Sequence, residues 1–379
     1  MSAFLPTPTV KEKLGILSTD AQYDLACACG PGADQGRVRS SDERWLYPAT
    51  VQNGGTGMLF RTLASNVCTN DCLYCPLRVG MDAVRRCALA PEEIAGSFLP
   101  YWRAGKVFGL FLTSGVCGTP DATMERLVDT AEILRRRHAF RGYIHLKLIP
   151  GASDAAIDAA LRVASAVSLN IETAGEAHFR RLTRRKDYVD GIVAPLRRVA
   201  ALTAKGAPFE RVKLTTQFVV GASDESDREI VRYTGALYDR LRLHRIFFSA
   251  YQRGLGDPGL PGERSAASNA DMLAREHRLY QVDFMLRKYG FSADEIGYAP
   301  SGNLRLDIDP KEEWARRHPE RYPVPLATAP REDLLRVPGL GPVAVRRILE
   351  ARAAGVRLRI PEEAGIPPRF ARRAAPYLR

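Results

Sequence analysis

Three cysteines in one short stretch are the residues of this chain best suited to chemistry. Cys68, Cys72 and Cys75 form the pattern C-x3-C-x2-C, which places three thiolates within eight residues. One loop of this kind can wrap an iron–sulfur cluster, and it supplies one ligand fewer than the four irons of a [4Fe-4S] cluster need. We therefore expect a [4Fe-4S] cluster with one iron left open.

The open iron indicates what chemistry the cluster could do. A small molecule with adjacent amino and carboxylate groups can chelate that iron, so an electron from the cluster can enter the molecule's sulfonium and break a carbon–sulfur bond, which makes a carbon radical. The alternative is a structural zinc site, for which a second C-x-x-C pair or regularly spaced His partners would be expected. Neither Cys87 nor Cys117 is an obvious fourth ligand, and the spacing favours the cluster.

Strands that alternate with helices must position this loop. The first expected strand, Met58–Asn66, runs directly into the cysteines, and five more are expected at Val107–Thr113, Tyr143–Ile149, Val167–Ile171, Lys213–Val220 and Arg245–Ala250. Helices are expected at Pro91–Arg103, Asp121–Arg137, from about Ser153, Val189–Lys205, Asp271–Tyr289 and Pro310–Arg317. This alternation predicts parallel pairing and an α/β fold, a β/α barrel with its chemistry at the carboxyl ends of the strands. Tyr251–Leu260, rich in Gly and Pro, predicts a loop that leaves the barrel.

With these elements in place, the chain resembles the radical S-adenosylmethionine superfamily over roughly Gln52–Pro300. Tyr74 matches the aromatic residue that precedes the third cysteine there. The resemblance implies a partial (β/α)6 TIM-type barrel, with a [4Fe-4S] cluster and S-adenosylmethionine as cofactors. It also implies that Thr113, Ser114 and Gly115 meet the methionine amino group, although the Glu of the family motif is missing here.

Other stretches extend the resemblance to the rest of the cofactor. Asn170 and Glu172 lie in a stretch, SLNIET, that is similar to the fourth-strand motif of biotin synthase and lipoyl synthase, where such residues hold the ribose. The alternative is that they cap the next helix. Arg184, Arg185 and Lys186 fall where those relatives place a cation for the methionine carboxylate, and we assign Lys186.

The remaining elements of the barrel support no catalytic assignment. Gln217–Glu225 resembles the element that packs against adenine in the superfamily, but it could equally be an ordinary turn and helix cap. Because no Ser-His-Asp set or paired His-Glu metal motif is present, nothing indicates hydrolysis. Tyr74, Cys117 and Tyr251 are expected to pack rather than to carry a radical, so the catalytic residues stay unassigned.

A second motif lies near the carboxyl end of the chain. The stretch LLRVPGLGPVAVRRI predicts a helix, a tight glycine hairpin and a second helix, and it resembles the helix-hairpin-helix DNA-binding module. The resemblance implies that Gly339, Leu340 and Gly341 offer amides to a phosphate and that Arg346 and Arg347 add charge. Ile360–Leu378 could be a degenerate second hairpin that packs against the first.

Charge points to the same end of the chain. The chain carries 55 Lys and Arg against 43 Asp and Glu, a formal charge of +12, and Arg331–Arg379 holds eleven Arg and five acids, or +6 of that excess. A partner such as DNA, bound through its phosphate backbone, fits this distribution, and a merely solvated surface is the alternative.

Length and bulk composition indicate the number of domains, the location of the protein and the role of its cysteines. At 379 residues and 45% hydrophobic, the chain is long enough for one large domain and a smaller one. Its start has no signal-like segment and no stretch approaches about 18 apolar residues, so we expect a cytoplasmic protein without a membrane span. Seven unevenly spaced cysteines favour metal or redox chemistry over disulfides.

The whole layout resembles a bacterial family of radical S-adenosylmethionine proteins described as DNA modification or repair proteins, linked to a uracil-DNA-glycosylase-like partner. This implies an N-terminal extension (1–50), a radical S-adenosylmethionine barrel (51–300), a connector (301–330) and a small all-α helix-hairpin-helix unit (331–379). It also implies a reductant such as flavodoxin or ferredoxin. Cys27 and Cys29 stand where the family is expected to have serines.

Two other functions stay open at this stage. One is a radical modifier or sulfur inserter that resembles biotin or lipoyl synthase and acts on something other than nucleic acid. The other is a non-catalytic DNA-binding protein whose cluster is structural or senses redox state.

Overall fold

The computed structural model describes residues 8–21, 44–50 and 55–379. Its contacts divide the chain into two compact units, Met1–Glu225 with Leu237–Met272, and Ser226–Ala236 with Leu273–Arg379. The first unit contains the sheet and the cysteines, and the second contains the hairpin motif. The boundaries expected at residues 50, 300 and 330 stay a proposal. No helix in the described part of the chain is long and apolar enough to cross a membrane.

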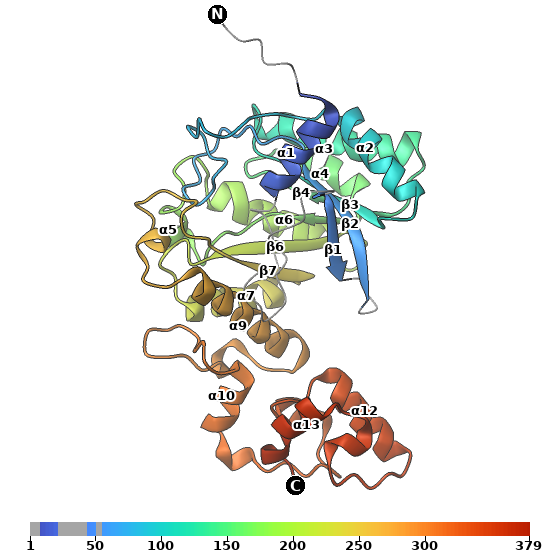
Figure 1. Cartoon of the computed structure of the whole chain (residues 1–379), viewed down its shortest axis with the longest axis vertical. Coiled ribbons are helices and arrows are strands. Elements are labelled where there is room, and N and C mark those ends of the chain that lie inside the picture. Colours follow the sequence, from blue (N-terminus) through green and yellow to red (C-terminus); the bar gives the residue numbers. More distant parts are fainter. Residues whose placement is uncertain (1–7, 22–43, 51–54) are drawn as a thin grey trace, which may run out of the picture. The chain divides into compact units, whose positions relative to one another are not determined.

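A single sheet organises the first unit (Figure 1). Its strands, which lie side by side in chain order, are β1 (Leu46–Thr50), β2 (Thr56–Leu63), β3 (Gly109–Thr113), β4 (Tyr143–Lys147), β5 (Ala166–Ser168), β6 (Lys213–Val220) and β7 (Arg245–Ala250). Neighbouring strands from β2 to β7 are all parallel. The α/β class and the six parallel strands are therefore confirmed.

One strand was not expected. β1 pairs antiparallel with β2, with Leu46 opposite Phe60, so part of the expected N-terminal extension is the first strand of the sheet. Pro48 hides this strand from sequence patterns, because proline lacks the amide that a central strand needs; at the edge of a sheet it is tolerated.

Helices connect the successive parallel strands from β2 to β7, α1 precedes the sheet, and α8 to α13 follow it. Those in the described part of the chain are α1 (Val10–Asp20), α2 (Pro91–Arg103), α3 (Pro120–Glu132), α4 (Asp154–Val163), α5 (Glu176–Phe179), α6 (Ala194–Leu202), α7 (Asp227–Leu241), α8 (Pro261–Arg264), α9 (Asn269–Lys288), α10 (Pro310–Arg317), α11 (Arg331–Arg336), α12 (Pro342–Ala353) and α13 (Pro368–Ala374). Side-chain caps start several of them, since Thr119 accepts the amide of Ala122 and Ser153 accepts that of Ala156.

The two faces of the sheet differ. Phe60 packs edge to face on Phe98 of α2 with ring centroids 5.8 Å apart, so even-numbered residues of β2 face the helices. On β6 the alternate residue Val219 packs instead with Leu73 and Tyr74 of the cysteine stretch. We call the face that carries Val219 the inner face, and strand alternation assigns the rest of each strand to one face or the other.

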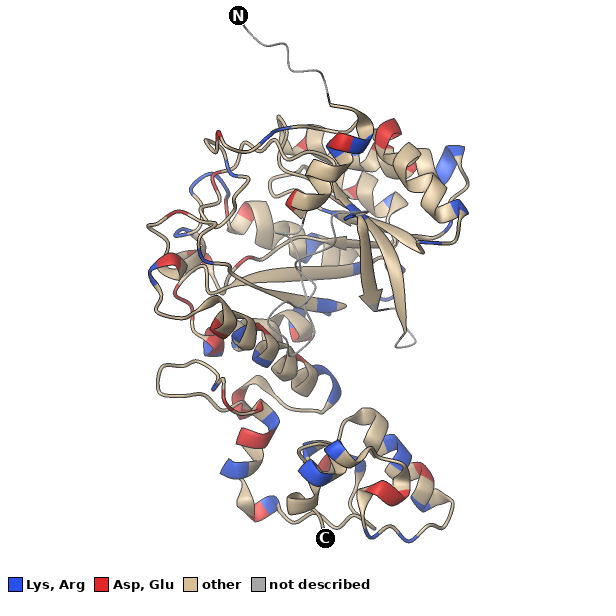
Figure 2. Cartoon of the chain, in the orientation of Figure 1, with Lys and Arg blue, Asp and Glu red and all other residues tan. Residues whose placement is uncertain are grey.

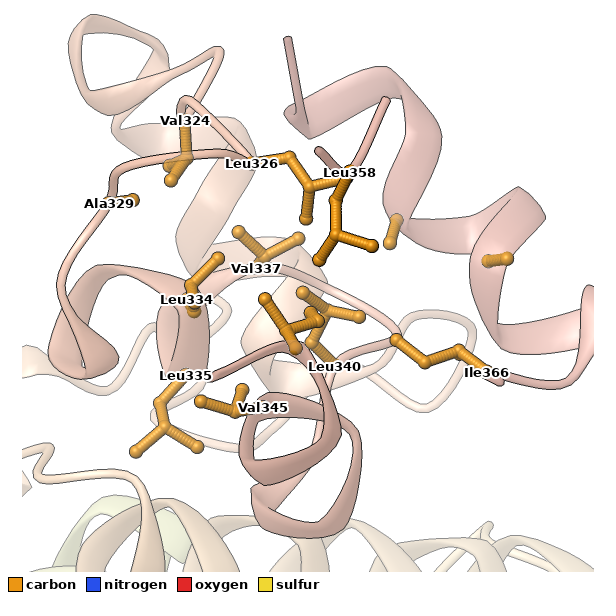
Figure 3. Close-up of a cluster of buried hydrophobic side chains, with 13 residues drawn as sticks. Val324, Leu326, Ala329, Leu334, Leu335, Val337, Leu340, Val345, Leu358 and Ile366 are labelled. Carbon is orange, nitrogen blue, oxygen red and sulfur yellow. The ribbon is translucent and has the colours of Figure 1, made fainter. Parts of the chain in front are cut away.

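The second unit ends in a small helical domain built on one apolar cluster (Figure 3). α11 leads through a turn at Pro338–Gly341 into α12, and a second turn at Gly365 leads into α13. Gly365 has a φ of +70°, which favours glycine. The cluster joins both turns and comprises Val324, Leu326, Ala329, Leu334, Leu335, Val337, Leu340, Val345, Ile348, Leu358, Ile366, Ala371 and Ala374.

Candidate functional site

The cysteine stretch lies at the carboxyl end of β2, where parallel α/β sheets place their chemistry. Arg86 stabilises the backbone conformation of the loop, because its guanidinium donates to the carbonyls of Leu77 and Arg78, each at 2.9 Å. Asn66, fully buried at the entry to the loop, accepts the amide of Cys87 at 2.7 Å. Side chains on both sides of the loop thus hold its backbone in place.

Two sulfurs accept amide hydrogen bonds. The amide of Val116 donates to Cys68 Sγ and that of Leu77 donates to Cys75 Sγ, both at 3.4 Å. Such bonds favour the thiolate form and, in iron–sulfur proteins, tune the reduction potential. The donor set therefore suits an iron–sulfur cluster.

The β3 motif approaches this loop closely because it contains a glycine. A Cβ on Gly115 would lie 2.5 Å from the carbonyl oxygen of Val67 and 3.1 Å from Cys68 Cβ. Thr113 is buried at the end of β3, and Ser114 Oγ donates to the carbonyl of Ser65 at 3.4 Å. All three predicted residues of the motif therefore lie beside the cysteine loop.

Burial disfavours the negatively charged thiolate forms of Cys72 and Cys75 unless a cation is bound beside them. Burial, reinforced by the neighbouring Cys72, raises the pKa of Cys75 to about 12. Burial also raises the pKa of Cys72, against the pull of Lys186. A group of positively charged irons would remove this penalty, since bound metal inverts the local pKa logic.

A buried ion pair lies beside Cys72. Lys186 Nζ is 3.2 Å from Glu172 Oε1, and only 8% and 4% of the two side chains is exposed. Burial alone would lower the pKa of Lys186, but the negative charges of Cys72 and Glu172 raise it. Tyr74 lies close to the same carboxylate, and burial followed by the charge of Glu172 raises its pKa. Cys72, Tyr74, Glu172 and Lys186 thus come together from three separate stretches.

Glu172 is held in an uncommon backbone conformation. Its φ is +66°, its amide donates to Gln217 at 3.0 Å, and its carbonyl accepts from Val219 at 2.7 Å. Strained conformations of this kind cluster at functional sites. Asn170 Nδ2 donates to Glu172 Oε2 at 3.4 Å, whereas Asn170 Oδ1 and the hydroxyl of Thr173 are buried with no hydrogen-bond partner. Orphaned polar atoms beside a buried acid indicate a site for a polar ligand.

Asp71 ties the two sides of the site together, and sequence reasoning missed it. Its carboxylate accepts the Thr183 hydroxyl and the amides of Arg184, at 3.1 Å, and Arg185, at 3.2 Å. Burial opposes ionisation of Asp71, but these hydrogen bonds outweigh it and lower the pKa. Arg184 and Arg185 are exposed, although Arg185 donates to the carbonyl of Thr69 at 2.6 Å, whereas the side chain of Lys186 is buried beside Glu172. The available signal was an acid between two cysteines of the C-x3-C-x2-C pattern.

The expected loop after β7 does not leave the barrel. Asp257 donates its amide to the carbonyl of Leu73 at 2.8 Å, and Arg78 donates to Leu255 at 3.3 Å, so this loop folds over the cysteines. Tyr251 donates to Glu263, and burial followed by this bond raises the Tyr251 pKa. The loop is held because Glu263 also accepts the amide of Gly254 at 2.8 Å.

Neither Cys87 nor Cys117 belongs to this group of side chains. Cys87 is buried with its sulfur 4.0 Å from the carbonyl of Lys13, and Cys117 exchanges hydrogen bonds with the Thr123 hydroxyl. Cys27 and Cys29 lie outside the described residues. Within the described residues, no three His, Cys, Asp or Glu side chains converge around the position of a single metal ion.

The hairpin residues lie in the second unit. Gly339 has a φ of +85°, and a Cβ there would lie 2.5 Å from the carbonyl oxygen of Phe370, so this glycine serves the packing of α13. Gly341 precedes α12, Leu340 is buried, and Arg347 donates to the carbonyl of Gly365 at 2.7 Å. The side chain of Arg346 is 68% exposed, and Figure 2 shows basic residues, all of them Arg, along α12 and α13.

Comparisons with known proteins give structural likeness only. No family model matches the chain, and no curated protein matches it. A solved structure of HydG, a maturase of the [FeFe]-hydrogenase, matches 59% of this chain and 49% of its own, at 14% identity and a TM-score of 0.44. The FeFe-hydrogenase maturase HydG from Carboxydothermus hydrogenoformans matches 60% of this chain and 51% of its own, at 14% identity and a TM-score of 0.46. The chain thus spans about half the length of these proteins, and its function has to be inferred from its own site.

Proposed function

We propose that this chain is a radical S-adenosylmethionine enzyme with a [4Fe-4S] cluster on Cys68, Cys72 and Cys75. The observation that carries this proposal is the placement of a three-cysteine loop at a strand's carboxyl end, beside the buried Lys186–Glu172 pair. When bound, the cluster supplies an electron that cleaves S-adenosylmethionine to methionine and a 5′-deoxyadenosyl radical.

The chain's own residues bind and orient the cofactor. Lys186 offers a buried positive charge to the methionine carboxylate, and Thr113–Gly115 approaches closely enough to present backbone groups to its amino end. Asn170 and Glu172 accept hydrogen bonds from ribose hydroxyls, which would satisfy the orphaned Asn170 Oδ1. Asp71 holds Lys186 against the cysteine loop.

We further propose that the substrate is DNA, modified or repaired in the cytoplasm with electrons from a flavodoxin or ferredoxin. Support comes from the +6 charge of Arg331–Arg379 and from the helix, glycine turn and helix at α11–α12, the order of elements that a helix-hairpin-helix module would have. The amides of Gly339 and Gly341, with the exposed Arg346, would hold phosphates regardless of DNA sequence, while the Leu340 amide donates to Val337 at 3.1 Å and holds the turn. A uracil-DNA-glycosylase-like protein is the proposed partner.

Iron loading tests the cluster assignment. Cys68→Ala, Cys72→Ala and Cys75→Ala should each abolish brown absorbance after anaerobic reconstitution, because each removes one of three ligands. Cys117→Ala, which removes a thiol outside the proposed ligand set, is the matched control and should load normally. Full iron in all three ligand variants would refute the assignment.

Product analysis tests the reaction. The reconstituted protein is reduced with dithionite and given S-adenosylmethionine with and without DNA, and 5′-deoxyadenosine is quantified. Formation that rises with DNA supports radical chemistry on nucleic acid. If the yield of 5′-deoxyadenosine is the same with and without DNA, the biotin- or lipoyl-synthase-like modifier is favoured. If a fully loaded cluster forms no 5′-deoxyadenosine, the non-catalytic sensor is favoured.

A further inference from the structure

Exposed apolar side chains gather in the small helical domain at the carboxyl end of the chain. Of the eight large hydrophobic residues that the described part of the chain leaves exposed, four belong to this domain: Val343, Val356, Ile360 and Phe370. Single apolar residues on a surface are ordinary. A group of four within the stretch that also holds +6 of the formal charge favours a partner that is both anionic and apolar.

Two of these residues lie next to the glycine turn at Pro338–Gly341. A Cβ on Gly339 would lie 2.5 Å from the carbonyl oxygen of Phe370, so the backbone of Phe370 contacts this turn directly. Val343 is the second residue of α12, two positions after Gly341. Phe370 is 40% exposed and Val343 57%. An aromatic ring is therefore accessible beside the amides that are proposed to hold phosphate.

The backbone that carries Phe370 is fixed by packing. Ala371 and Ala374, on the same helix, are buried in the apolar cluster of Figure 3. Arg347 donates to the carbonyl of Gly365 at 2.7 Å, which holds the turn before α13. A side chain on such a backbone is preorganised, so less entropy is lost when it binds a ligand.

Positive charge surrounds the Phe370 ring. The guanidinium carbon of Arg369 lies 4.5 Å from the ring centroid, which is a cation–π contact. Residues 365–379 contain four Arg and no Asp or Glu. Arg373 pairs with Glu312 at 3.0 Å, whereas the exposed Arg369 and Arg372 have no carboxylate partner among the described residues. The charges of these two arginines are thus available to an anion.

A nucleobase with its flanking phosphates fits this combination of groups. Bases have flat faces that stack on aromatic rings and on guanidinium planes, and the backbone places phosphates on both sides of each base. Phosphate binding alone would need only the cations. In a perfect duplex the neighbouring base pairs cover these faces, so the ring can stack only on a base that is unpaired.

We propose that Phe370 and Arg369 form a stacking site for an unpaired base of single-stranded DNA, beside the turn that holds phosphate. This inference rests on the proposed function and specifies the form of DNA that the chain binds. An enzyme that modifies a base has to take it out of the helical stack, which costs free energy. Stacking of an unpaired base on Phe370 offsets part of that cost.

Fluorescence anisotropy on the cluster-loaded full chain tests the site without any turnover. The probes are a single strand of about 12 nucleotides, its perfect duplex and an abasic strand of the same length. Phe370→Ala should weaken binding of the single strand at least about fivefold, because it removes the stacked ring, and should leave the other two affinities unchanged. Phe370→Tyr keeps an aromatic ring and should bind all three probes as wild type does.

Phe284→Ala is the matched control. Phe284 is 43% exposed on α9, and Arg287 lies 5.4 Å from its ring centroid, but this arginine is paired with Asp283 at 2.9 Å. The control should bind every probe as wild type does. Arg369→Gln should weaken binding of the single strand, whereas Lys205→Gln, which removes an exposed lysine from the first unit, should not.

The outcomes distinguish this inference from the proposed function. If Phe370→Ala binds the single strand as wild type does, or weakens binding of the abasic strand or the duplex equally, Phe370 is not a stacking site, although DNA remains the partner. If wild type binds none of the probes, both the stacking site and the DNA partner are excluded. If poly-glutamate of equal charge binds as tightly as the single strand and loses as much affinity in Phe370→Ala, the surface fits an acidic protein and the inference fails.

Discussion

Replacing Gly115 with Ala tests how tightly the β3 motif supports the cysteine loop. The added Cβ would lie 2.5 Å from the Val67 carbonyl oxygen, whereas ordinary contact begins at 3.4 Å. The oxygen must therefore withdraw by about 0.9 Å (3.4 − 2.5), at an overpacking cost of about 1–3 kcal/mol. Cys68 follows Val67 directly, so its sulfur moves with it.

The consequence for the cluster follows from the Val116 amide. That amide is now 3.4 Å from Cys68 Sγ, already near the limit for such a bond, and a shift of the size above lengthens the distance to at most about 4.3 Å (3.4 + 0.9), which weakens or breaks the hydrogen bond. We expect Gly115→Ala to fold but to bind less than about half the iron of wild type after anaerobic reconstitution, with a matching loss of brown absorbance.

Gly96→Ala is the control for this experiment. Gly96 lies in α2 with nothing within 4 Å of the position that a methyl group would take, so alanine should raise stability by about 0.5–1 kcal/mol and leave iron content unchanged. If Gly115→Ala binds as much iron as wild type, the close approach of β3 does not support the loop and the reasoning is wrong.

Three further predictions concern single side chains. Asp71→Asn should weaken S-adenosylmethionine binding about tenfold in equilibrium dialysis while iron content stays near wild type, because Lys186 loses its support; an unchanged Kd would contradict this. Burial lowers the pKa of Lys311 to about 7, so between pH 7 and its ordinary value of about 10.4 the unfolded chain binds the extra proton and stability should rise with pH. In denaturation at pH 6 to 10, Lys311→Met should flatten that rise, and an equal slope in both proteins would exclude Lys311 as its source. Arg346→Gln should reduce the salt dependence of DNA binding by about one unit of log Kd against log salt, whereas Lys205→Gln should not; equal slopes would remove Arg346 from the interface.

Sequence patterns predict this site well where its residues lie close together in the sequence. Cys68, Cys72 and Cys75 lie within one loop, and buried runs such as that around Phe60 show the strand before it. Asn170 and Glu172 likewise lie on one short motif. The proximity of Glu172 to Cys72 and Tyr74, by contrast, joins stretches about a hundred residues apart, which no local pattern predicts.

Long-range contacts account for what sequence patterns missed. Asp71 matters because amides more than a hundred residues later donate to it, and no local pattern encodes that. β1 escaped notice because its Pro48 breaks the strand pattern, and α1 because its apolar stripe is short. The loop at Tyr251–Leu260 has the composition of a linker, yet backbone bonds to Leu73 hold it in place.

The contacts of the cysteine loop have a consequence for how this region opens. Leu73 accepts the amide of Asp257 and donates its own amide to Leu182, while Asp71 accepts amides just beyond Leu182. Three stretches far apart in the chain therefore share their hydrogen bonds, and none can detach without exposing the others. They should exchange amide hydrogens as one cooperative unit, and ligand binding should slow exchange in all three together.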